Sequence, residues 1–279
     1  MHLIAKMSDV RERSIIYIFI IVLLSGCESV ENLGIKPFMG NIQVTNKPCK
    51  VTSMKKTGGL EMRIVYNGLN PSAFIGNLPD FDKLTYNSEK KLISAVLGEE
   101  TTLEFVENNK GNITEINFKG VEAAGAFNYP TILTYDAKDR LSEISLQFPT
   151  LSSGALAFQI EYNNDDNITK IKQETSIGFK DLLVNHSFDD MKSPFRDQKI
   201  GQVLSYLMVY SLTLGHANYS YFLSRNNVTS ATVTNNNGRT ELGMEYEYNS
   251  EGFPTDIKIS KTFEGRVKAE SESFTYDCF

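Results

Sequence analysis

The sequence contains no tryptophan and only three histidines and three cysteines in 279 residues. Enzymes that act on carbohydrates usually present tryptophan platforms to sugar rings, so the absence of Trp counts against that class. His186 and His216, the two histidines outside the N-terminal segment, have no other ligand at metal-binding spacing. The sequence has neither a Gly-x-Ser-x-Gly elbow nor a phosphate-binding loop. We therefore expect no metal, no cofactor and no catalytic residues, in a chain that is not an enzyme.

Positive charge is also in short supply. The chain has 28 Lys and Arg against 34 Asp and Glu, which gives a net charge of −6. A surface that binds nucleic acid normally carries an excess of Lys and Arg, so the composition argues against a nucleic-acid partner. Carboxylates are plentiful, for example Glu99-Glu100 and Asp189-Asp190, and a glycosidase needs two of them in a cleft. A glycan-processing enzyme therefore remains the last of three functional alternatives.

The N-terminal segment has a hydrophobic run that is too short to cross a bilayer. The run from Ile15 to Leu24 has about ten residues, whereas a membrane-spanning helix needs roughly 20. Lys6, Arg11 and Arg13 precede it and form a positive region. This pattern is typical of a signal peptide, with either Met1 or Met7 as the first residue.

The signal peptide ends in Leu24-Ser25-Gly26-Cys27, which resembles the signal of bacterial lipoproteins. The resemblance implies cleavage after residue 26 and fatty acyl chains, such as palmitate, on Cys27. An ordinary signal peptide with a chance cysteine is the alternative. Two or three acyl chains, at about 0.8 kcal/mol per buried CH₂, would hold the protein on the outer membrane. Glu28 and Glu31 resemble the acidic export signal of surface lipoproteins and favour the cell surface slightly over the periplasmic face.

Residues 27–45 lack periodicity and are predicted to be a flexible tether, which leaves residues 46–279 as a single β-rich domain. Cys49 and Cys278 lie in strand-like segments at the two ends of that domain. An oxidising compartment permits a disulfide between them, and closing so long a loop is worth on the order of 5 kcal/mol. Two separate buried thiols are the alternative.

One pattern recurs along the domain: an aromatic residue, Asn or Asp, a polar turn of about four residues, and then an aliphatic residue. It predicts β-hairpins, because Asn and Asp bond nearby backbone N–H groups in turns and tolerate a positive φ. Gly111 and Gly252 stand where a positive φ is expected. Repeated hairpins predict a meander in which each unit packs against its neighbours. The copies begin at Tyr86-Asn87, Tyr135-Asp136, Tyr162-Asn163 and Tyr248-Asn249, with a looser copy from Phe105 and a truncated one at Tyr276-Asp277.

The hairpins resemble the tyrosine–aspartate (RHS-like) repeats of large bacterial shell-forming proteins. They resemble more closely a group of Bacteroidetes-type envelope lipoproteins of uncharacterised function with a few degenerate repeats. The second resemblance rests also on the stretch from Phe188 to Phe195, followed by a short helix, Asn226-Asn227 and the hairpin from Tyr248 to Thr255. It covers most of residues 86–279 and implies no catalytic residue.

One amphipathic helix is expected over residues 194–214. Ser193 and Pro194 have the sequence of an N-cap and a first helical residue. Helical spacing then continues through apolar residues, and Gly215 is a plausible stop. The helix is expected to fill the core. The alternative is a lid over a ligand cavity lined by tyrosines. The apolar positions are Ile200, Val203, Leu204, Leu207 and Met208, and the tyrosines are Tyr206, Tyr210, Tyr219 and Tyr221.

We therefore expect a mainly-β domain, an antiparallel meander of hairpins in a twisted or partly closed sheet with one helix on a face. The leading functional hypothesis is a lipid-anchored, non-enzymatic envelope protein that binds a partner protein or a glycan. The second is a carrier that holds a lipid or another apolar ligand between sheet and helix.

Overall fold

A computed structural model of the protein describes residues 47–279, apart from 78–80, 98–100, 123–124, 148–154, 197, 215–216 and 237. The predicted signal peptide, Cys27 and the predicted tether lie outside the described residues.

The domain is a single antiparallel sheet of sixteen strands in meander order, which confirms the predicted fold class. Each hairpin pairs with the next along the chain, and the first strand pairs with the last. The strands are β1 (Cys49–Lys56), β2 (Leu60–Asn67), β3 (Asn70–Gly76), β4 (Lys83–Tyr86), β5 (Leu92–Leu97), β6 (Thr101–Glu107), β7 (Ile113–Glu122), β8 (Gly125–Tyr135), β9 (Leu141–Gln147), β10 (Ala155–Tyr162), β11 (Ile168–Thr175), β12 (Gly178–Lys192), β13 (Asn226–Asn235), β14 (Gly238–Tyr248), β15 (Pro254–Phe263) and β16 (Arg266–Cys278).

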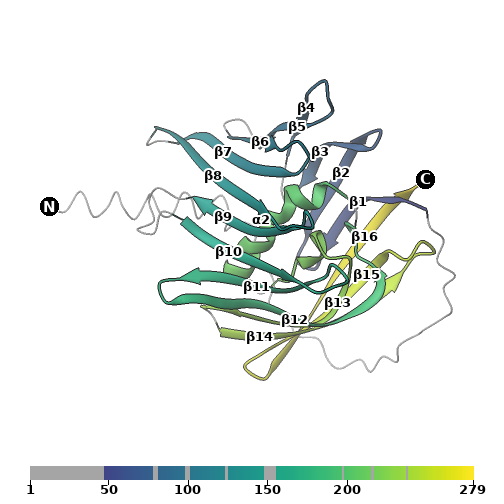
Figure 1. Cartoon of the computed structure of the whole chain (residues 1–279). Coiled ribbons are helices and arrows are strands. Elements are labelled where there is room, and N and C mark those ends of the chain that lie inside the picture. Colours follow the sequence, from purple (N-terminus) through teal and green to yellow (C-terminus); the bar gives the residue numbers. More distant parts are fainter. Residues whose placement is uncertain are drawn as a thin grey trace.

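The sheet curls until its two edges meet. The edge strands β3 and β4 follow one another in the chain, and a single bridge joins Phe74 of β3 to Phe81 just before β4. The Phe74 N–H donates to the Phe81 carbonyl at 2.9 Å, and the two buried rings pack edge to face at 5.3 Å. The sheet is therefore nearly closed, and it wraps around the helix α2 (Figure 1).

Five hairpin turns share one geometry. In each, the side-chain oxygen of the first Asn or Asp accepts the N–H groups two and four residues later. The fourth residue of each turn has a positive φ, as predicted for Gly111 and Gly252. In an antiparallel meander alternate turns lie at the same end of the strands. These five turns therefore form one rim, called the turn rim below. Its turns are residues 87–91, 108–112, 136–140, 163–167 and 249–253.

Tyrosine hydroxyls link neighbouring hairpins below this rim. Five tyrosines that directly precede Asn or Asp donate to a backbone carbonyl of an adjacent hairpin at 2.7–2.8 Å. One of them is Tyr66, so the strands before residue 86, which show no clear repeat in the sequence, share this contact. The donors and acceptors are Tyr66 and Val51, Tyr86 and Pro71, Tyr135 and Ile113, Tyr162 and Leu141, and Tyr276 and Pro254.

Between β12 and β13 the chain leaves the sheet, and residues 193–225, called the insert below, enter its interior. The insert contains α2 (Ile200–Leu214) and the short 3₁₀ helix η1 (Ser220–Phe222). Most of α2 is buried among inward-facing strand residues, which matches the predicted core-filling helix. Within the described part of the chain, no helix combines the length and apolarity that crossing a bilayer requires.

The predicted start of the helix at residue 194 is wrong, because α2 begins at Ile200. The Ser193 hydroxyl donates to the carbonyl of Ser224, so it does not cap a helix. The second residue of α2 is Gly201, where a Cβ would lie 2.0 Å from the carbonyl oxygen of Phe222. The glycine therefore lets the two segments of the insert approach each other.

Candidate functional site

A pocket of about 470 Å³ opens where the insert meets the first hairpins at the turn rim. Its walls come from β1 to β5, the β14–β15 turn, the chain end and the start of the insert. This volume lies in the range of pockets that hold small molecules. The lining residues are Lys47, Pro48, Cys49, Lys50, Tyr66, Leu69, Asn70, Pro71, Tyr86, Lys90, Leu92, Lys192, Arg196, Gln198, Lys199, Ile200, Val203, Phe253 and Phe279.

The lining of this pocket is strongly cationic. It contains five lysines and one arginine, and it contains no Asp or Glu, in a chain whose net charge is −6. Two of the cations form ion pairs with carboxylates that do not line the pocket: Lys50 lies 3.1 Å from Asp277, and Lys199 lies 2.5 Å from Glu107. Among the described residues, no ion pair joins Lys90 or Lys192 to a carboxylate. The pocket therefore carries a net positive charge.

Aromatic rings position two of these cations. The Lys50 ammonium lies 4.9 Å from the centre of the Tyr66 ring and 5.5 Å from that of Phe279. The Lys192 ammonium lies 5.0 Å from the centre of the Phe253 ring. Contacts of this kind stabilise a cation without neutralising it. Of the two, Lys192 has no described carboxylate partner and is the one left to contact a ligand.

The two tyrosines of the lining stay neutral. Burial raises the pKa of Tyr66 above its ordinary range. Burial and the Glu107 carboxylate raise the pKa of Tyr86 to about 12. Their hydroxyl groups are bonded to the carbonyls of Val51 and Pro71. They therefore add no negative charge at neutral pH, and they hold the wall of the pocket in place.

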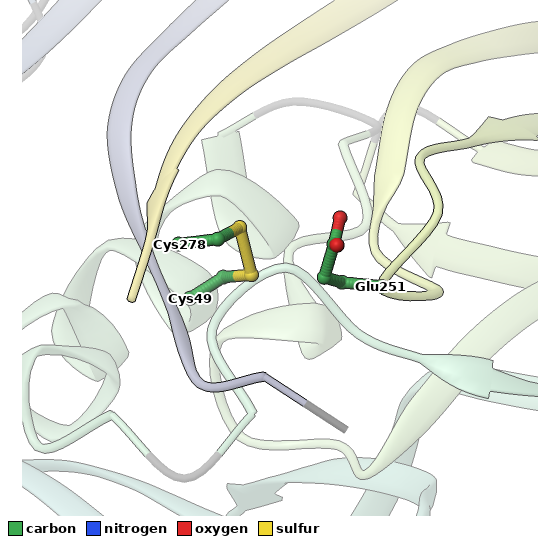
Figure 2. Close-up of side chains that lie close together, drawn as sticks. All are labelled: Cys49, Glu251 and Cys278. Carbon is green, nitrogen blue, oxygen red and sulfur yellow. A yellow bond between two sulfur atoms is a disulfide. The ribbon is translucent and has the colours of Figure 1, made fainter. Parts of the chain in front are cut away.

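A disulfide between Cys49 and Cys278 forms part of the wall, with a separation of 229 residues along the chain. It joins the start of β1 to the end of β16, so the first and last strands are linked covalently beside the pocket. Figure 2 shows the Glu251 side chain facing the bridge from the β14–β15 turn. Because the two sulfur atoms are bonded to each other, this group offers no thiolate to a metal ion.

The insert is attached to the rim through backbone N–H groups that the hairpins leave free. In three hairpins a register shift occurs beside the turn, and the first residue after that turn gives its N–H to a side chain: these residues are Leu92, Ile113 and Ile168. Side chains of the insert accept two of these groups: Gln202 takes the N–H of Ile113 at 3.3 Å, and Ser224 takes that of Ile168 at 3.1 Å. Gln198 bonds the backbone of β1 through both amide atoms: its oxygen accepts the Val51 N–H at 3.5 Å, and its nitrogen donates to the Cys49 carbonyl at 3.3 Å.

One hairpin carries a carboxylate in place of the tyrosine. Glu107 directly precedes Asn108, so it, and not Phe105, occupies the tyrosine position of the looser repeat. Its Oε1 accepts the Leu92 N–H at 2.9 Å and the Lys199 ammonium at 2.5 Å. The Glu107 side chain is 2% exposed. This substitution ties the start of the insert to β5 at the base of the pocket.

The tyrosines predicted as possible ligand contacts do not line this pocket where their side chains are described. Tyr219 and Tyr221 are buried in the core, where Tyr221 donates to Glu272 at 2.9 Å and Lys56 donates to Tyr219 at 3.3 Å. Tyr206 packs against the core, half-buried, and the side chain of Tyr210 lies outside the described residues.

The carboxylates that the sequence singled out lie away from the pocket or outside the described residues. Asp189 accepts from the backbone of Asn227 and from the hydroxyl of Tyr248, and so braces the junction of β12 and the insert. Glu99-Glu100 lies outside the described residues. The lining of this pocket contains no Asp or Glu, the side chains that serve as acid and nucleophile in a glycosidase.

Sequence reasoning missed the cations of the pocket. Lys90 stands in a repeat turn and Lys192, Arg196 and Lys199 flank the start of the insert, so each looked like an ordinary surface charge. The signal that was present is local: residues 192–199 contain three cations. Only the fold brings them beside Lys47 and Lys50.

No protein-family model matches the chain, and no curated protein sequence matches it. Among solved structures, the chain is similar to a porin-like protein from Bacteroides uniformis ATCC 8492. The identity is 13%, the TM-score is 0.44, and the match covers 84% of this chain and 99% of that one. A second similarity, to the structure called TcdB2-TccC3-TEV, has 11% identity and a TM-score of 0.19, and covers 74% of this chain and 14% of that one. Similarities this distant leave the function to be argued from the residues.

Proposed function

We propose that the chain is a non-enzymatic envelope protein, anchored to the outer membrane by lipid on Cys27, that binds a ligand in the cationic pocket. The ligand is a glycan or an exposed segment of a partner protein. The observation that carries the proposal is a lining of six cationic side chains with no Asp or Glu, only two of them described as paired with carboxylates outside the lining, in a chain of net charge −6. A fold gains nothing from gathering like charges, which repel one another, so their concentration favours an anionic ligand.

Capture from the native envelope tests this function. The full chain, solubilised in detergent with what it binds, is compared with Lys192→Glu, which reverses a pocket charge. Lys138→Glu is the matched control, because Lys138 is an exposed lysine in the turn 136–140, on the same rim but outside the pocket. We expect Lys192→Glu to lose a captured species that Lys138→Glu retains. Identical capture by both variants would contradict the pocket as the binding site.

The anchor is tested separately. Cys27→Ala removes the thiol that the lipid modification requires, so fatty-acid labelling of the chain should disappear and the protein should be released or remain unprocessed. Normal labelling of this variant would refute the anchor and leave the pocket unaffected.

The carrier hypothesis keeps one supporting observation, since Ile200 and Val203 of α2 contribute apolar surface to the pocket. It predicts that lipid co-purifies with the chain and leaves when these two residues are made polar. The charge of the lining favours the anionic ligand over an uncharged apolar one.

A further inference from the structure

Four kinds of surface meet in the pocket: lysine ammonium groups, aromatic ring faces, short aliphatic side chains and a side-chain amide. We infer that its ligand is an oligosaccharide that carries carboxylate or sulfate groups. This inference rests on the proposed function and names the chemical class of the ligand for the same site.

The type of cation is the first argument. Five of the six cations are lysines. A lysine ammonium is a compact point charge with three rotatable donors, whereas the arginine fork suits planar, bidentate recognition. Lysines distributed around a pocket therefore suit a ligand that carries several separate anionic groups, each contacted from one side. An acidic oligosaccharide has this arrangement, with one anionic group on each charged sugar.

The apolar surface between the cations is the second argument. Phe279 is 54% exposed and Leu69 is 68% exposed, and both line the pocket. A sugar ring has an apolar face of C–H groups, which an exposed ring or aliphatic side chain can cover, and its hydroxyl groups can bond an amide such as that of Asn70. A free inorganic anion would leave this surface unused.

The shape of the site separates a soluble saccharide from a membrane surface. A bilayer presents its anionic headgroups along a plane, at the membrane surface. Here the cations line a hollow of about 470 Å³ between the insert and the sheet. A chain-like ligand that enters the hollow reaches Lys192 and Lys90 together with Phe279, whereas a flat surface meets only the outermost of them.

Calorimetric titration of the full chain in detergent tests the inference. The probes are an oligogalacturonate of three sugars, a sulfated oligosaccharide of similar length and a neutral galactose oligomer. We expect saturable binding of one or both acidic probes, weakening as salt rises, and no measurable binding of the neutral one. The two acidic probes distinguish carboxylate from sulfate recognition.

Three variants locate the binding. Lys90→Gln and Lys192→Gln should each weaken the acidic probe by roughly tenfold, the order expected for one charge-assisted hydrogen bond. Lys138→Gln, with the same change of charge outside the pocket, should leave the affinity unchanged. Phe279→Ala should weaken binding of the acidic probe, whereas Phe279→Tyr should retain it, which separates sugar stacking from charge.

Two results would overturn the inference. One is binding of the neutral oligomer as tightly as the acidic ones. The other is pocket-dependent binding to anionic phospholipid vesicles, lost in Lys192→Gln, with no binding of any oligosaccharide. Neither result contradicts the proposed function if Lys192→Glu still loses a captured species. The titration therefore tests the class of the ligand, and the capture experiment tests the pocket as a binding site.

Discussion

Two arcs of the same turn rim treat positive charge differently. One arc consists of the turns 108–112, 136–140 and 163–167 and is called the paired arc below. Its cations pair with carboxylates of the same turn or of the next one. Lys110 lies 2.7 Å from Asp139, and Arg140 lies 2.7 Å from Asp136 and 2.9 Å from Asp166. On the pocket arc, formed by the pocket-lining residues, Lys90 stands at the position of a similar turn, yet no described carboxylate pairs with it. The repeat therefore tolerates either arrangement, and Lys90 and Lys192 are pocket cations for which the described residues supply no carboxylate partner.

The arcs also differ in what supports them. The paired arc is held by hairpin-to-hairpin contacts, such as the hydroxyl of Tyr162 on the carbonyl of Leu141 and the guanidinium of Arg140 over the Tyr162 ring at 4.5 Å. The pocket arc borders the sheet's closure, where among the described residues one bridge joins Phe74 of β3 to Phe81 just before β4. Beside the pocket the disulfide joins β1 to β16, and the Glu107–Lys199 pair joins β6 to the insert.

Removing the disulfide should produce the largest difference in stability between the two arcs. Replacing both cysteines, Cys49→Ser with Cys278→Ser, should lower the free energy of unfolding by about 5 kcal/mol, because the bridge closes a loop of 229 residues. Denaturant unfolding measures the total loss. Hydrogen exchange should show faster opening of β1 and β16 than of β9 to β11. Equal protection of both regions in the variant would show that the pocket arc does not depend on the bridge.

Glu107 tests whether the pocket arc relies on a contact that the paired arc lacks. Glu107→Ala leaves the N–H of Leu92 and the ammonium of Lys199 without their acceptor, which should destabilise the protein by roughly 1–3 kcal/mol. Tyr135→Phe is the matched change on the paired arc, and losing its one hydrogen bond should cost about 1 kcal/mol. Unfolding curves of the two variants give the comparison. A smaller loss in Glu107→Ala than in Tyr135→Phe would contradict the proposed anchoring of the insert.

Removing one positive charge should lower the stability of the protein more on the paired arc than on the pocket arc. Arg140→Gln breaks contacts with Asp136, Asp166 and the Tyr162 ring and should lower the unfolding free energy by about 1 kcal/mol. Lys90→Gln removes no ion pair described in the structure and should change it by less than about 0.5 kcal/mol. Thermal unfolding of both variants without ligand provides the measurement. Equal destabilisation would show that the pocket cations serve the fold.

The smallest expected effect concerns how the stability of the fold depends on pH, through one carboxyl group of the paired arc. Burial opposes ionisation of Asp136, but hydrogen bonds from Arg140 and the backbone outweigh it and lower its pKa below the ordinary 3.8. A carboxyl group with a lowered pKa in the folded state stabilises the fold above its unfolded pKa and loses that contribution as the pH falls. Stability below pH 3.8 should therefore fall less steeply in Asp136→Asn than in the unchanged chain. Parallel curves of unfolding free energy against pH for the two proteins would show that Asp136 does not contribute to this pH dependence.

The sequence predicted the hairpins because their determinants are local. An Asn or Asp, a residue with positive φ three positions later and a preceding tyrosine lie within six residues of one another, as at Tyr135-Asp136 and Asp139. The helix as a core element was also predictable from its spacing. Its start was not, because the predicted N-cap residue Ser193 instead donates to the carbonyl of Ser224, a contact between two segments of the insert.

The candidate site was not predictable, since its residues come from segments that only the curled sheet brings together. Lys47 and Lys50 lie more than a hundred residues from Lys192 and Lys199 in the chain, and they meet because β1 pairs with β16 and the insert returns to the same rim. The replacement of tyrosine by Glu107 could have been recognised by counting back from Asn108. The aromatic Phe105 two positions earlier obscured it.

A crystal structure of the full chain with the three-sugar oligogalacturonate tests the central claim most directly. The account predicts density for the saccharide in the pocket, with a carboxylate about 3 Å from the ammonium of Lys192 or Lys90 and a sugar face against Phe279. Saccharide bound instead on the paired arc, or an empty pocket in crystals whose solution binding is saturated, would contradict it.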